Sequence, residues 1–157
     1  MGQENRRARR FNLSIAVTLV LHDTKHRLVL ANPVRGKLID ISLYGARLSI
    51  PHIRTGNNHL FYACNDDPAK VIHLEVLDKE GEDLLVVPAH PVWFDHVLVD
   101  PASKHFELGV EFLVPPEDPN ITRLHAFVAL QPAPLQGGWL KKLLQLGQTF
   151  SQMVHLR

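Results

Sequence analysis

The sequence predicts an all-β fold, a closed antiparallel barrel followed by C-terminal helices. The clearest support is the stretch from Phe11 to Leu21, where every odd position is apolar. This period-two pattern is typical of a strand with one buried face. Further short β-rich stretches follow, mostly separated by Gly, Pro, Asn or Asp, at 27–30, 36–41, 46–50, 71–77, 84–87, 92–99 and 106–113. About six or seven such strands without helices between them favour a barrel, because closure removes unpaired edges.

The chain changes character after residue 114. Asp118 followed by Pro119 resembles a helix N-cap with proline at the first helical position, so we expect a helix ending near Leu130. Residues 131–138 are rich in Pro and Gly and read as a linker. A second amphipathic helix is expected over 139–157, with one broad apolar side formed by Leu140, Leu143, Leu144, Phe150, Met153 and Val154. That side could pack on the barrel, pair with a second chain as a homodimer, or dock a target.

Composition describes an ordinary soluble globular protein. The chain has 157 residues, of which 45% are hydrophobic and 21% charged, and its net charge is +1. That balance gives no general reason to expect DNA, RNA or membrane binding. Cys64 is the only cysteine, so an internal disulfide is impossible. We see no secretory signal and no apolar run of about 20 residues, and therefore expect a cytoplasmic protein without a membrane span.

Four arginines stand immediately before the first predicted strand: Arg6, Arg7, Arg9 and Arg10. Arg6 and Arg10 are four residues apart, so they share a face in either a helix or an extended chain. Two forked guanidinium groups on one face suit paired phosphates or the O6/N7 edge of guanine. Taken alone, such a cluster is more often a solvated basic tail.

A second polar motif lies between two predicted strands, at Asp40, Ser42 and Gly45. Asp40 is an acceptor that can take the N1–H and N2–H of a guanine, and Ser42 can donate or accept. Gly45 could adopt a positive φ or allow a ligand close to the backbone. The alternative is a hairpin connection in which Asp40 and Ser42 bond neighbouring amides.

Together the two motifs resemble the PilZ family, whose pattern is RxxxR followed by [D/N]xSxxG. Arg6 and Arg10 match the first part, and Asp40, Ser42 and Gly45 match the second. The segment 108–113 also resembles the last barrel strand of such domains. The resemblance covers about residues 6–130 and implies a six-stranded antiparallel PilZ-like β-barrel with one or two α-helices.

The resemblance also implies a ligand, the bacterial second messenger cyclic di-GMP. Residues 1–10 would be a flexible ligand-binding segment in front of a barrel-and-helix domain at 11–130. Arg6 and Arg10 would contact phosphates and guanines. Asp40 would contact a guanine, while Ser42 and Gly45 would complete the pocket. Arg7 and Arg9 fall outside the pattern; they could add contacts, though solvent is the more frequent environment for such residues.

We therefore expect a receptor that acts as an adaptor. The motif begins at Arg6 and no output enzyme follows, so signalling would require a separate effector protein. Repulsion among the arginines should keep the first ten residues mobile until the ligand orders them. Two other functions remain open: a PilZ-like interaction module that does not bind cyclic di-GMP, and a small barrel that binds nucleic acid through its arginines.

Other chemistry finds little support in the sequence. The ten histidines show no metal-ligand spacing, and Cys64 has no partner cysteine, so no metal or cofactor is expected. Ser42 lacks the Gly-x-Ser-x-Gly setting of a nucleophile, and nothing points to an enzyme. Trp93 lies on a β-rich segment, where we expect it to belong to the core.

Overall fold

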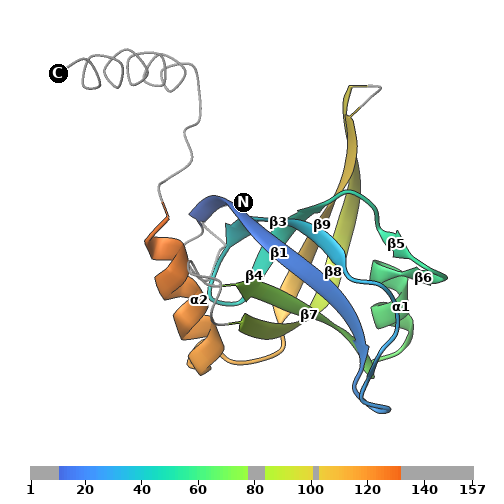
Figure 1. Cartoon of the computed structure of the whole chain (residues 1–157), viewed down its shortest axis with the longest axis horizontal. Coiled ribbons are helices and arrows are strands. Elements are labelled where there is room, and N and C mark those ends of the chain that lie inside the picture. The colour runs from blue at the N-terminus through green and yellow to red at the C-terminus, as the bar shows by residue number, and fades with distance from the viewer. Residues whose placement is uncertain (1–10, 78–83, 101–102, 132–157) are drawn as a thin grey trace.

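The computed structural model describes residues 11–77, 84–100 and 103–131. Six antiparallel strands form a closed barrel in the order β1–β3–β4–β9–β8–β7, and β7 pairs back to β1 (Figure 1). Their bounds are Phe11–Asp23 (β1), Val34–Ile41 (β3), Gly45–Ile50 (β4), Lys70–Leu77 (β7), Leu84–Asp100 (β8) and Ser103–Phe112 (β9). The predicted fold class is confirmed.

Three very short strands lie outside the barrel. β2, Leu28–Val29, adds to β1 after a turn that begins at Asp23. β5, Arg54–Thr55, and β6, Asn58–His59, pair only with each other. They contribute little to the core and lead into the first helix.

The core forms as the alternation of β1 predicts. Ile15, Val17, Leu19 and Leu21 are all buried, and they face apolar side chains from the other barrel strands. Burial of side chains of this size stabilises a fold by roughly 1.5–3 kcal/mol each, which fixes the register of β1 against slippage by one residue.

The two helices of the described residues lie at opposite ends of the barrel (Figure 1). α2, Pro119–Ala129, begins as predicted: the Asp118 carboxylate accepts the backbone N–H of Asn120 at 2.9 Å, and Pro119 follows it. The buried side chains of Ile121, Leu124 and Val128 attach this helix to the barrel.

The short helix α1, Leu60–Asp66, was not predicted. It is too short to show a helical apolar stripe, and its N-cap is a histidine rather than Ser, Thr, Asp or Asn. The backbone N–H groups of Phe61 and Tyr62 donate to Nδ1 of His59 at 3.2 and 3.3 Å. Leu60 and Cys64 anchor α1 in the core.

The cap makes α1 sensitive to pH. A protonated Nδ1 cannot accept a hydrogen bond. Burial first, and the charge of Arg54 second, lowers the pKa of His59 below its ordinary 6.5. Because the folded-state pKa lies below the unfolded value, this contribution to stability is complete above about pH 6.5. It is lost as the pH falls through the folded-state value.

His59→Asn should therefore reduce the loss of stability on acidification, because asparagine caps without titrating. Urea unfolding of both proteins between about pH 8 and about pH 5.5 measures the difference. His59→Ala is the matched control and should lose about 1 kcal/mol even at the higher pH. The same pH dependence in wild type and His59→Asn would contradict this role of His59.

The region 84–99 is one continuous strand rather than the two that were expected. Proline normally interrupts a central strand because it lacks an N–H donor. Here Pro88 lies in the part of β8 that pairs with β7, and Pro91 lies in the part that pairs with β9. Each proline thus has a register partner on one neighbouring strand only, and on the other side of Pro88 its carbonyl accepts the N–H of Leu113 at 2.9 Å, a bond that needs no proline N–H.

Several expectations fall outside the described residues: the arginine segment 1–10, the linker expected at 131–138 apart from Gln131, and the helix expected over 139–157. Among the residues that are described, no helix combines the length and apolar character needed to cross a bilayer.

Candidate functional site

The turn between β3 and β4 carries the Ser42 motif. The Ser42 N–H donates to the carbonyl oxygen of Gly45 at 2.9 Å. The N–H groups of Tyr44 and Gly45 donate to Ser42 Oγ at 3.2 and 3.3 Å. Ser42 therefore holds the backbone of the turn, as the hairpin interpretation expected, and it fixes the position of the exposed residues Leu43 and Tyr44.

Gly45 is required by close approach rather than by a left-handed backbone. Its φ is not positive, so that part of the expectation was wrong. A Cβ atom at this position would run into the carbonyl oxygen of Val110 on β9. The N–H of Phe112 donates to the carbonyl of Tyr44 at 2.8 Å, which holds the turn against β9.

A β-bulge aims Asp40 out of the barrel. Leu38 pairs with Leu48 in the core, whereas Asp40 pairs with Arg47, so Ile39 is an extra residue on β3. Without this insertion, the period of two would turn Asp40 to the same side as Leu38. The side chain lies on the outer face and is 6% exposed.

A single row of register partners crosses the outer face from Asp40. Asp40 pairs with Arg47 on β4, Arg47 with Gly109 on β9, and Gly109 with Trp93 on β8. A second bulge, at Val92, turns Trp93 to this face. The row therefore brings a carboxylate, a guanidinium and an indole onto one surface beside the Ser42 turn.

Trp93 is not a core residue, which corrects the sequence-based expectation. It is 41% exposed. Its indole lies directly over Gly109, where a Cβ atom would overlap the ring. The outer face thus presents a partly exposed aromatic ring that lies on the backbone of Gly109 and can stack on a planar group.

Arg47 is a site residue that the sequence analysis missed. One of its terminal nitrogens lies 3.4 Å from the Glu107 carboxylate. Its Nε is buried and has no hydrogen-bond partner among the described residues. A buried donor of this kind is costly unless a ligand or water satisfies it. The only signal in the sequence was its position two residues after Gly45.

His125 connects the turn to α2. Its Nε2 lies 3.0 Å from the carbonyl oxygen of Ser42. The protonated nitrogen can donate to this oxygen, so the last barrel-capping helix is bonded directly to the motif. The sequence analysis did not single out His125.

The first strand of the barrel, β1, begins next to this surface. Phe11, the first residue of β1, is the register partner of Ile41, and Asn12 is the partner of Asp40. Arg6, Arg7, Arg9 and Arg10 precede this point in the chain and lie outside the described residues. The structure therefore brings together Asp40, Ser42 and Gly45, and it starts β1 beside them.

Several other reactive groups in the described part of the chain are buried or hydrogen-bonded. Burial raises the pKa of the Cys64 thiol to about 12, so a nucleophilic thiolate is not formed near neutrality. His26 bonds Asp23 at 2.9 Å, and His90 bonds Asn65 at 3.1 Å. Within the described ranges, no group of three His, Cys, Asp or Glu side chains could hold a metal ion.

A family model for the PilZ domain matches residues 4–130, which include every residue of this surface and both sequence motifs. The chain belongs to the PilZ family. The PilZ fold is also found in solved structures. The structure of the PilZ domain of YcgR from Escherichia coli with c-di-GMP superposes with a TM-score of 0.51 at 14% identity, over 80% of this chain and 91% of that one.

A second solved structure is less similar. The PlzA protein of Borreliella burgdorferi in complex with c-di-GMP gives a TM-score of 0.47 at 13% identity, over 83% of this chain and 55% of that one. No curated protein matches the sequence. The PilZ assignment therefore rests on the family match and the barrel.

Proposed function

We propose that this PilZ protein is a receptor for cyclic di-GMP. The observation that carries the proposal is the row on the outer face, where Asp40, Arg47 and Trp93 lie across neighbouring strands beside the Ser42 turn. These three side chains together suit a ligand that has anionic groups, N–H donors and a flat ring. A cyclic dinucleotide with guanine bases has all three.

Each side chain can serve a different part of such a ligand. The Asp40 carboxylate can accept N1–H and N2–H of a guanine as a pair. Arg47 supplies a guanidinium whose Nε still requires an acceptor, which a phosphate oxygen or guanine O6 would provide. Stacking on the exposed Trp93 indole would hold a base by its face.

The arginine segment would close over the ligand from the other side. β1 begins beside Asp40, so Arg6 and Arg10 are within a short length of chain of the surface. Two guanidinium groups would neutralise the two phosphodiesters of the ligand. In this proposal, binding orders the segment, and the reshaped face is recognised by a separate effector protein, with the chain acting as an adaptor.

Calorimetric titration with cyclic di-GMP tests the assignment and gives the stoichiometry. We expect saturable binding, with 5′-GMP binding much more weakly because it lacks the second nucleotide. Absence of binding at high micromolar concentration would support the alternative of an interaction module that does not use its motif.

The same titration should show that Trp93→Ala weakens binding about 10-fold or more, because loss of one base–aromatic stack costs roughly 1–3 kcal/mol. Trp93→Phe keeps a ring and should lose less. Leu98→Ala, at another exposed apolar position of β8, is the matched control and should bind as the wild type does. Equal affinity in Trp93→Ala and wild type would remove Trp93 from the site.

A further inference from the structure

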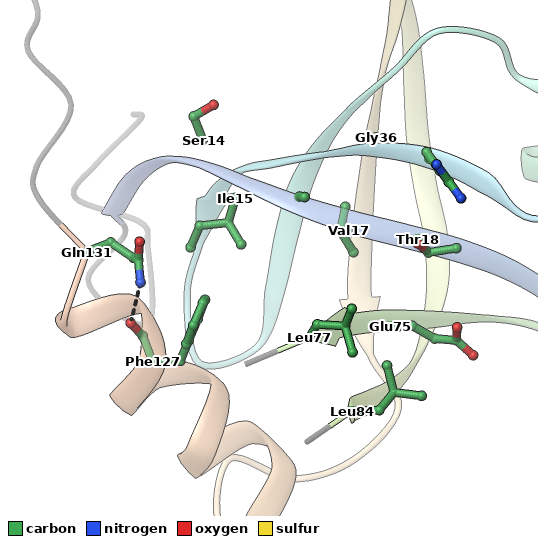
Figure 2. Close-up of a pocket in the computed structure, with 12 residues that line it drawn as sticks. Ser14, Ile15, Val17, Thr18, Gly36, Glu75, Leu77, Leu84, Phe127 and Gln131 are labelled. Atoms are coloured by element: carbon green, nitrogen blue, oxygen red, sulfur yellow. Dashed lines mark hydrogen bonds between the residues drawn. The ribbon is translucent and has the colours of Figure 1, made fainter. Parts of the chain in front are cut away.

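A groove of about 680 Å³ runs between β1 and α2, and none of its lining residues belongs to the Asp40 row. Figure 2 shows Phe127 projecting from α2 toward the side of β1 that carries Ile15, with Leu77 and Leu84 farther along the same opening. Val17 continues the apolar lining on β1. The groove combines these apolar side chains with polar ones, among them Arg35 and Glu75, and it is open to one side.

The groove exists because β1 is paired unevenly. β1 pairs with β3 from Phe11 to Leu19, but it pairs with β7 only from Thr18 onward. Among the described strands, residues 11–17 thus have a strand on one edge and face the groove on the other. β7 and β8 continue past the end of this pairing and present Leu77 and Leu84, which are 57% and 50% exposed. Facing leucines exposed to this degree form an apolar rim that a partner could cover.

The chain itself leaves the described structure at this groove. Gln131, the last described residue, is one of the lining residues, and its amide donates to the carbonyl of Phe127 at 3.4 Å. The linker 132–138 can span at most about 25 Å, so the segment 139–157 cannot be far from the rim. As a helix, that segment would be about 28 Å long. A short linker of this kind gives an effective concentration in the millimolar range, so a modest apolar contact is enough for occupancy.

We propose that the C-terminal segment 139–157 docks as an amphipathic helix in the groove between β1 and α2 of its own chain. The apolar side formed by Leu140, Leu143, Leu144, Phe150, Met153 and Val154 would cover Leu77, Leu84 and Phe127. The docking is independent of the nucleotide site, since none of its contacts belongs to the Asp40 row. It assigns an occupant to the groove and a function to the segment 139–157.

Amide hydrogen exchange on the full chain tests the docking from both sides of the contact. In the wild type, amides of 139–157 should exchange at least about tenfold more slowly than in Leu143→Asp, which places a charge on the apolar side. Gln145→Asp introduces the same charge on the opposite side of the helix and should leave the protection intact. Leu77→Asp should release the segment from the groove side. Leu98→Asp, at an equally exposed leucine on the distant part of β8, should not.

Three results would overturn the proposal. The first is wild-type exchange in 139–157 as fast as in Leu143→Asp. The second is protection that survives Leu77→Asp, which would mean that the segment packs elsewhere. The third is protection that increases with protein concentration together with a dimeric mass by light scattering, which would assign the groove to the segment of a second copy.

Discussion

Replacing Arg6 or Arg10 with alanine is expected to weaken binding of cyclic di-GMP about 10- to 100-fold. A hydrogen bond to a charged group contributes roughly 1.5–3 kcal/mol, and every 1.4 kcal/mol corresponds to a factor of ten in affinity. Both residues precede β1, which starts beside Asp40, so their loss should remove the cationic half of the site and leave the barrel intact. Calorimetry on the two variants measures the change directly.

Arg7→Ala and Arg9→Ala are the matched controls. They remove the same charge from the same segment, but they lie outside the RxxxR spacing. If the effect depends on position, these variants should bind within a few-fold of wild type. If all four variants weaken equally and the weakening disappears at high salt, the segment contributes only general attraction to an anion. Unchanged affinity in both Arg6→Ala and Arg10→Ala would refute the proposed site.

The strand that the sequence predicted best was the one with the simplest physical rule. In β1, the apolar odd positions from Ile15 to Leu21 turn to one face, and burial of that face fixes the strand. The start of α2 could be predicted equally well, because an Asp cap followed by proline sets the beginning of a helix through contacts within a few residues. Local chemistry of this kind can be read without knowing the rest of the fold.

Only part of the site could be predicted from the sequence, because its geometry depends on pairing between distant strands. Asp40 and Ser42 were found from their spacing, but the bulges at Ile39 and Val92 are visible only once the strands are paired. The Val92 bulge decides that Trp93 faces outward, and the pairing of β4 with β9 decides that Arg47 lies beside it. Trp93 was expected in the core because it lies on a β-rich segment, and that expectation could not include the inserted residue.

Gly45→Ala is expected to destabilise the protein by about 1–3 kcal/mol, the usual range for added atoms in a packed region. The new Cβ atom would meet the backbone carbonyl of Val110, which cannot rotate away as a side chain could. The turn would then have to move away from β9, and the bond from the Phe112 N–H to the Tyr44 carbonyl would lengthen or break. Thermal unfolding should show a decrease in Tm of roughly 3–10 °C.

The same displacement should weaken cyclic di-GMP binding even where the variant is fully folded, because Gly45 sets the distance between the Ser42 turn and the strand that supports Trp93. Leu43→Ala changes an exposed residue of the same turn without touching β9, so its stability should stay within about 0.5 kcal/mol of wild type. Titrations well below the Tm of each variant separate the two effects. If Gly45→Ala unfolds earlier but binds normally, the glycine serves only the barrel. If Gly45→Ala is as stable as wild type, the space between β4 and β9 can accept a Cβ atom, and the close approach does not require glycine. Loss of both stability and affinity is the outcome expected if the contact between Gly45 and β9 positions both the Ser42 turn and the row of binding residues.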